Sequence, residues 1–290
     1  EAYVVGGCVR DSILDRVPGD WDITTSALPE QVKELFHRTV DTGIQHGTVT
    51  VMMGKEGFEV TTYRVDGEYH DGRHPDAVTF TRSLEEDLKR RDFTINAMAY
   101  HPGHGLVDLF GGMEDINRKL IRCVGDPVER FTEDALRMLR AVRFSAQLGF
   151  TVEENTKAAL TKMSGNLEHV SAERIQTELV KLLVSDHPDY LRTAWETGLT
   201  REFLPEFDAC MEEIQKRDII NEDFITHIKV RETDKIQKAY VYTRLKGCFL
   251  YVINKREQIV VPTEKQLMHE LDRIDMSEED MNQIFINTIK

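Results

Sequence analysis

Two aspartates separated by one residue have the clearest chemical potential in this sequence. Asp20 and Asp22 flank Trp21 in a segment, 21–25, that predicts a β-strand. Alternate residues of a strand share a face, so the two carboxylates would project together while Trp21 and Ile23 turn into the core. Adjacent carboxylates repel unless a cation lies between them, and Mg²⁺ prefers carboxylate, phosphate and water oxygens. Two such ions, roughly 3.5–4 Å apart, could activate an attacking hydroxyl and stabilise leaving pyrophosphate; the alternative is a pair of solvated surface aspartates.

Two glycines and an arginine lie just upstream of this pair. The predicted strand 2–5 ends at Gly6 and Gly7, and a helix that carries Arg10 is expected to follow. Glycines at such a junction let backbone N–H groups approach a triphosphate, the helix N-terminus favours anions, and Arg10 adds a charged donor. The pattern matches neither the dinucleotide fingerprint nor a P-loop, and a simple tight turn is the alternative.

A third carboxylate is predicted on a neighbouring strand. Residues 47–53 and 58–63 resemble a hairpin that turns near 54–57, and Glu59 faces away from Phe58 and Val60. Glu59 is therefore a candidate catalytic residue, as metal ligand or base. An exposed strand glutamate explains the position equally well.

Composition restricts the class of protein. The chain has 290 residues, enough for two domains or for one domain with a helical extension, and its net charge of −14 argues against a surface coated in positive charge for nucleic acid. A local basic cleft remains compatible with that charge. Cysteines at 8, 123, 210 and 248 form no CxxC pair, and no apolar run approaches a membrane span, so we expect a cytoplasmic protein without a zinc site.

The pattern of elements divides the chain. Residues 1–125 mix short strands and helices, whereas the pattern from about Asp126 is helical almost throughout. We expect an α/β head at 1–125, a helical neck at 126–205 and a helical body at 206–290. The predicted helices cover 29–37, 130–148, 153–163, 171–184, 188–197 and 264–273.

Four stretches of sequence, in order, resemble the motifs of class II tRNA nucleotidyltransferases (CCA-adding enzymes) and bacterial poly(A) polymerases. They are Gly6-Gly7-x-Val9-Arg10-Asp11 with Asp20-x-Asp22, Arg90-Arg91-Asp92-Phe93-Thr94-Ile95-Asn96-Ala97, Glu133-Asp134-Ala135-Leu136-Arg137-Met138-Leu139-Arg140, and Ser171-Ala172-Glu173-Arg174-Ile175 with Glu178. The resemblance covers residues 2–205. It implies an α+β fold in which a polymerase β-like head, a mixed sheet with helices, precedes an all-α neck and body.

The resemblance also assigns roles. It implies Mg²⁺ as cofactor, ATP and CTP as substrates and tRNA as partner, and it leaves a homodimer open. By position, Asp20 and Asp22 would bind metal, and the remaining matched residues would bind nucleotide: Gly7, Arg10 and Arg91, with Asp92 and Asn96 shaping the ribose pocket.

The third motif is predicted to select the base. Asp134 precedes Arg137 by three residues, close enough on a helix for a hydrogen bond. In the family reading this pair is a protein template, because a carboxylate can accept from the amine of cytosine or adenine and a guanidinium can donate to the ring. Arg140 and Arg143 could contact the triphosphate. The alternative is an amphipathic helix with a solvated arginine face.

A charged loop, 66–76, contains two glycines and a proline and is predicted to be mobile. In the family a flexible loop here helps to reshape the site between C and A addition, which favours complete CCA addition or A addition. The loop holds the sole His-Asp pair, His70-Asp71, which we interpret as loop chemistry because no other metal-spaced histidines accompany it.

Residues 206–290 carry no assignable motif. The candidate phosphate contacts there are Lys235, Lys238, Arg244, Lys246, Lys255 and Arg256, for which a solvated face is the alternative. The leading hypothesis is CCA addition to tRNA. An A-adding enzyme or poly(A) polymerase is the runner-up, and a catalytically silent RNA-binding protein is the alternative of another class.

Overall fold

The computed structural model describes residues 1–67, 78–205, 207–209 and 211, and it describes the backbone of strands at 225–233, 236–243, 247–254 and 259–260. The predicted helix 264–273 and the charged segment 68–77, with His70 and Asp71, lie outside the described residues. So do the side chains of all six candidate phosphate contacts beyond residue 206.

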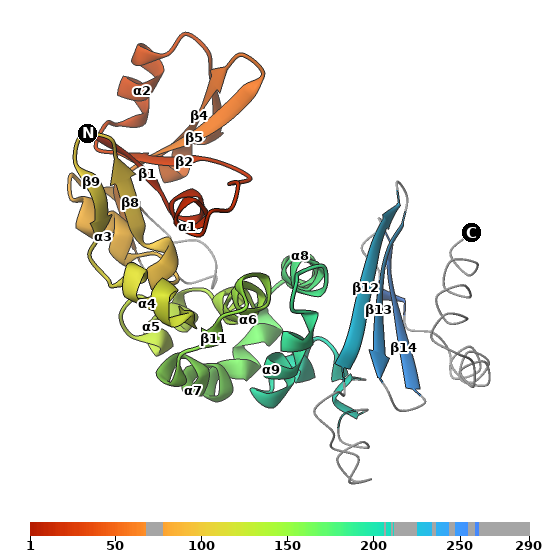
Figure 1. Cartoon of the computed structure of the whole chain (residues 1–290). Coiled ribbons are helices and arrows are strands. Elements are labelled where there is room, and N and C mark those ends of the chain that lie inside the picture. Colours follow the sequence, from red (N-terminus) through yellow and green to blue (C-terminus); the bar gives the residue numbers. More distant parts are fainter. Residues whose placement is uncertain are drawn as a thin grey trace.

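A seven-stranded mixed sheet forms the head (Figure 1). Its strand order is β3-β4-β5-β2-β1-β8-β9. β2 and β5 run parallel, and the other neighbouring strands are antiparallel. The strands are β1 (Ala2–Val5), β2 (Asp22–Thr25), β3 (Thr39–Gly43), β4 (Thr48–Met53), β5 (Glu56–Thr62), β8 (Met98–His101) and β9 (Gly105–Asp108). The predicted strand at 2–5 and the hairpin at 47–63 are therefore confirmed.

Short helices accompany this sheet. Two of them begin at residues that cap or initiate a first helical turn. Pro29 opens α2 (Pro29–Leu35), and Gln31 Oε1 accepts from the Leu28 N–H at 2.9 Å. Ser83 caps α3 (Leu84–Lys89) by accepting from Glu86 N at 3.3 Å. The other head helices are α1 (Gly7–Ile13) and α4 (Gly112–Arg118), and a small hairpin pairs β6 (Arg64–Asp66) with β7 (Val78–Phe80).

The neck is helical, as predicted. Its helices are α5 (Pro127–Glu133), α6 (Leu136–Leu148), α7 (Glu154–Met163), α8 (Ala172–Leu183) and α9 (Leu191–Glu196), and β10 (Leu120–Ile121) pairs with β11 (Thr151–Val152). The predicted helix 130–148 is wrong as one element because Asp134 adopts an extended conformation between α5 and α6. Its side chain accepts from Leu136 N at 3.0 Å, a local hydrogen bond that competes with helix continuation. Gly149 ends α6 in the left-handed conformation, as expected.

One hydrophobic core joins the head to the neck. It combines Val9, Phe93 and Ile95 of the head with neck side chains such as Leu139 and Val142, all of them buried. The Phe93 and Phe144 rings meet edge to face with centroids 5.9 Å apart. The part of the head that carries Val9, Phe93 and Ile95 is therefore fixed against α6 by packing.

The prediction of a helical body over 206–290 is wrong for the strands described there. Ile225–Thr233, Ile236–Thr243, Gly247–Asn254 and Ile259–Val260 form a four-stranded antiparallel sheet, β12 to β15 (Figure 1). The physical reason lies in β-branched and aromatic residues, which are frequent in these segments and favour strands, as in Tyr240-Val241-Tyr242 and Tyr251-Val252-Ile253. Where the domain boundaries lie stays a prediction.

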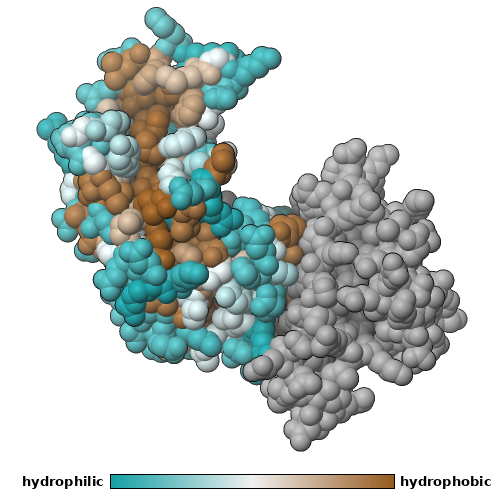
Figure 2. All heavy atoms as spheres, in the orientation of Figure 1, coloured by the Kyte–Doolittle hydropathy of each residue, from teal (hydrophilic) through white to brown (hydrophobic). Residues whose placement is uncertain are grey.

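Hydrophobic side chains are unevenly distributed over the surface. Figure 2 shows hydrophobic residues gathered on the upper head and hydrophilic residues concentrated on the lower face of the neck. Within the described part of the chain, no helix combines the length and apolar character that a membrane crossing requires.

Candidate active site

Two carboxylates are register partners where β2 and β5 lie side by side, and a third precedes β2 in the sequence. Asp22 is the first residue of β2, and Glu59 is its register partner on the parallel strand β5. Asp20 lies exposed just before the strand. The predicted burial of Trp21 is wrong: it is 45% exposed, because the strand begins only at Asp22 and the alternation of faces does not extend back to Trp21.

The electrostatics of this group suit a cation. Burial raises the pKa of the Asp22 carboxyl, the charges of Asp20 and Glu59 raise it further, and the Arg91 guanidinium opposes them. A divalent cation would relieve this mutual repulsion. In the described ranges no three metal-ligating side chains gather into a cage, so an ion held by Asp20 and Asp22 would complete its coordination with phosphate and water oxygens.

The glycine turn brings two guanidinium groups close to the backbone. Gly6 has φ +82°, a conformation that L-residues rarely adopt, and a Cβ there would lie 3.0 Å from Nη1 of Arg91. A Cβ on Gly7 would lie 3.7 Å from Nη2 of Arg10. The buried Nε of Arg91 has no hydrogen-bond acceptor among the described residues, a property that fits an anionic ligand.

Arg10, Asn96 and Asp92 are directly connected. Arg10 Nη1 donates to Asn96 Oδ1 at 2.6 Å, and Asn96 Nδ2 donates to Asp92 Oδ1 at 3.1 Å. Arg10 also pairs with Asp11 at 2.8 Å. The sequence placed these residues in one nucleotide site, and the structure brings them together; their contact with nucleotide stays a prediction.

Arg140 extends this network into the neck. Its Nε and Nη2 donate to Asp92 Oδ2 at 2.8 and 2.6 Å, and its Nη1 lies 4.0 Å from Glu178 Oε1 on α8. Burial alone raises the pKa of Asp92, but Arg140, Asn96 and Arg137 together outweigh it and hold that pKa well below its usual range. Asp92 is therefore ionised and fixed in orientation.

Arg143 is buried, unlike the solvated side chain of the alternative interpretation, and its contact with triphosphate stays a prediction. It is 7% exposed, and its Nε donates to Glu178 Oε2 while its Nη1 donates to Gln147 Oε1, both at 2.8 Å. Its guanidinium lies 3.6 Å from the centroid of the Phe144 ring, which Arg10 and Arg140 also approach. These contacts assign Arg143 a structural link between α6 and α8.

Asp134 and Arg137 have other partners than the ones predicted. Asp134 Oδ2 accepts from Arg174 Nη2 at 2.7 Å. Arg137 pairs with Glu133 and donates its Nη2 to the Arg90 carbonyl at 3.3 Å. Asp134 lies just before α6 and Arg137 lies in its first turn, where Arg137 N donates to the Asp134 carbonyl at 3.0 Å. Their role as a base template stays a prediction.

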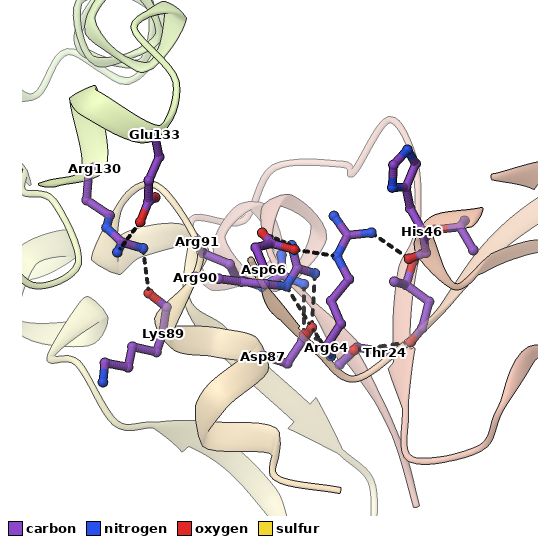
Figure 3. Close-up of polar contacts among 12 residues, drawn as sticks. Thr24, His46, Arg64, Asp66, Asp87, Lys89, Arg90, Arg91, Arg130 and Glu133 are labelled. Atoms are coloured by element: carbon purple, nitrogen blue, oxygen red, sulfur yellow. Dashed lines mark hydrogen bonds and ion pairs between the residues drawn. The ribbon is translucent and has the colours of Figure 1, made fainter. Parts of the chain in front are cut away.

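Sequence reasoning missed a buried ionic cluster behind Arg91 (Figure 3). Asp87 is fully buried and accepts from Thr24 Oγ1 at 2.9 Å and from Arg90 Nε at 3.0 Å. It also lies 3.6 Å from Arg91 Nη2. Burial alone would raise the pKa of Asp87, but Arg90 and Arg91 outweigh burial and lower it. The one signal in the sequence was the spacing of Asp87 three and four residues before the two arginines.

Comparison with known families identifies two matched regions. Residues 2–122 match the family described as "Poly A polymerase head domain", and residues 149–211 match "Probable RNA and SrmB- binding site of polymerase A".

Curated relatives are similar to this chain over roughly two thirds of its length or more. The CCA-adding enzyme of Leuconostoc mesenteroides is 58% identical over 184 residues, which are 63% of this chain and 46% of the relative. The CCA-adding enzyme of Lactobacillus helveticus is 52% identical over 215 residues, 74% of this chain and 54% of the relative. The chain thus spans about half the length of these relatives.

Solved structures of CCA-adding enzymes are also similar to this chain. The Bacillus stearothermophilus CCA-adding enzyme in complex with CTP is 49% identical, with a TM-score of 0.64 over 69% of this chain and 48% of that one. The Thermotoga maritima CCA-adding enzyme complexed with tRNA is 28% identical, with a TM-score of 0.59 over 74% of this chain and 52% of that one.

Proposed function

This chain belongs to the class II CCA-adding enzyme family, and from that premise we propose that it adds CMP and AMP from CTP and ATP to the 3′ end of tRNA. The reaction is nucleotidyl transfer without a nucleic-acid template: the tRNA 3′-hydroxyl attacks the α-phosphate, and pyrophosphate leaves. The observation that carries the proposal is the register of Asp22 beside Glu59, with Asp20 adjacent and Arg91 close enough to influence the pKa of Asp22.

The carboxylates and the arginines would have different roles, the carboxylates in binding metal and the arginines in binding the triphosphate. Asp20 and Asp22 would hold divalent metal, which we propose is Mg²⁺, and metal at this position supplies charge stabilisation to the attacking and leaving oxygens. Glu59 is a candidate ligand or base. Arg91, whose Nε lacks an acceptor among the described residues, offers a donor to the triphosphate beside the Gly6-Gly7 turn.

The ribose and the base would be read by different elements. Asp92 and Asn96, held by Arg140 and Arg10, present fixed acceptors and donors to the sugar. Asp134 and Arg137 would read the base edge, since a carboxylate accepts from the exocyclic amine that cytosine and adenine share and uracil lacks. Arg174 holds the Asp134 carboxylate from α8, so base reading would include release or sharing of that contact.

A primer-extension assay tests the proposal. The chain is incubated with tRNA that lacks its terminal CCA and with CTP, ATP or both. Incorporation of two C residues and one A supports CCA addition. A alone, or a long A tail, indicates the A-adding enzyme or poly(A) polymerase. No incorporation by a protein that still binds the tRNA indicates a silent RNA-binding module.

The variant Asp22→Asn separates chemistry from folding. We expect incorporation to be abolished while the unfolding transition stays within about 1 kcal/mol, because the carboxylate is only half-buried and its charge is already disfavoured. Retained turnover would refute the metal assignment.

A cytoplasmic location belongs to the same proposal and is supported by the buried free thiols of Cys8 and Cys123.

A further inference from the structure

We propose that Arg90 is a positioning residue for base selection: its side chain is clamped by two aspartates, and its main-chain carbonyl holds the guanidinium of Arg137. The inference rests on the proposed function, because it takes Arg137 as a group that reads the base. Arg90 itself has no assigned contact with nucleotide. Its effect would pass through the placement of its own peptide group.

The side chain of Arg90 is fixed on two sides (Figure 3). Its Nε and Nη2 reach Asp87 Oδ1 at 3.0 and 2.9 Å, and its Nη1 lies 3.7 Å from Asp66 Oδ2 on β6. The Asp87 and Asp66 side chains are 0% and 6% exposed, so both interactions are sheltered from solvent. Only a planar fork can approach both carboxylates at once, and a lysine has a single point of charge.

The main-chain carbonyls at the end of α3 accept hydrogen bonds from two arginines of the neck. Arg137 Nη2 donates to the Arg90 carbonyl at 3.3 Å, and Arg130 Nη1 donates to the Lys89 carbonyl at 3.3 Å. Figure 3 shows Arg130 and Glu133 on the neck side and the Asp87 cluster on the head side of this segment. The end of α3 is therefore the place where the head contacts the guanidinium that is expected to meet the base.

Arg90 joins these two sets of contacts within one residue. If the Arg90 side chain loses its contacts with the two aspartates, the peptide between Arg90 and Arg91 gains freedom, and the carbonyl that accepts from Arg137 Nη2 moves with it. Hydrogen bonds weaken steeply with misalignment, so a small displacement at this carbonyl would alter the direction of the Arg137 fork. A residue that merely stabilised α3 would change the amount of active protein and leave base preference alone.

The test is Arg90→Lys, measured as kcat/KM for CTP and for UTP in single-nucleotide incorporation on tRNA without its end. We expect the CTP-to-UTP ratio to fall about fivefold or more, the change expected when one hydrogen bond to the reading group is weakened. We expect the KM for CTP to rise more than kcat falls, since the metal-binding carboxylates are unchanged.

A second variant and a control keep the outcome clear. Asp66→Asn leaves the Asp87 pair intact and should lower the ratio in the same direction, by less. Arg118→Lys is the matched control, because the Arg118 side chain is 63% exposed and its ion-pair partner among the described residues is the exposed Glu114 of its own helix. It should leave the ratio unchanged. A wild-type protein that adds no nucleotide would overturn the proposed function itself; an active wild type with an unchanged ratio in both Arg90→Lys and Asp66→Asn would overturn this inference alone.

Discussion

Replacing Glu178 by glutamine should destabilise the neck far more than a conservative change usually does. Glu178 receives Arg143 Nε at 2.8 Å, with the two side chains 6% and 8% exposed, and its other oxygen lies 4.0 Å from Arg140. The amide fills the same volume, so no cavity forms, but it removes the charge that compensates buried arginine. Hydrogen bonds to charged groups contribute about 1.5–3 kcal/mol, and breaking a buried ion pair costs up to about 3–5. We expect about 2–3 kcal/mol because the amide oxygen still accepts.

Urea unfolding at neutral pH measures this loss. The chain has two tryptophans, and in a Trp21→Phe background the fluorescence of Trp195, packed against the main core, reports unfolding of the neck. The control Glu114→Gln alters an exposed pair at 3.5 Å and should cost less than about 0.5 kcal/mol.

A double-mutant cycle with Arg143→Met identifies the cause. If the buried charge is responsible, the double variant should recover at least about 1 kcal/mol relative to the sum of the single changes. Strict additivity, or a Glu178→Gln cost no larger than that of the Glu114 control, would refute the reasoning.

Three further predictions follow from the site. Asp134→Ala should relax base choice, raising UTP incorporation relative to CTP about tenfold for one lost base contact, by competition assay; unchanged discrimination counts against a template role. Gly6→Ala should lower the free energy of unfolding by about 1–2 kcal/mol and raise the KM for CTP, because the added Cβ would contact Arg91. The control Gly105→Ala introduces similar backbone strain but has open space around its Cβ, so it should leave the KM for CTP unchanged. Asp92 has a folded pKa below its unfolded value of about 3.9, so its charge contributes stability that is complete above that value and is lost as pH falls through the folded pKa. The stability gap between wild type and Asp92→Asn should therefore narrow as pH falls below about 4, and a gap independent of pH would contradict the assignment.

The local sequence pattern was sufficient to predict many of the strands and helices of the head. The strand 2–5 and the hairpin at 47–63 follow from alternation and turn residues, and α2 follows from a proline at its first position. The relation of Asp22 to Glu59 was predictable as two neighbouring strands with acidic side chains on the accessible face. Their exact register was not, since pairing depends on contacts across 37 residues of chain.

The errors have physical causes that a single sequence hides. Helical periodicity runs through Asp134 without interruption, so the competing side-chain hydrogen bond to Leu136 gives no periodic signal. Arg143 looks solvated on a helical wheel because its partner Glu178 lies on another helix. In the region 225–260, β-branched and aromatic residues favour strands, but they do not alternate regularly with polar residues, so the period-two signal of a strand is weak.

The core shared by head and neck has a practical consequence for anyone who wishes to graft this catalytic unit onto another RNA-binding module. A fragment that stopped near residue 125 would keep Asp20, Asp22 and Glu59, yet it would expose Phe93 and Ile95 and remove Arg140 from Asp92. Chimeras should therefore be joined beyond α8, where the transplanted piece retains its own interior and its own counter-charges.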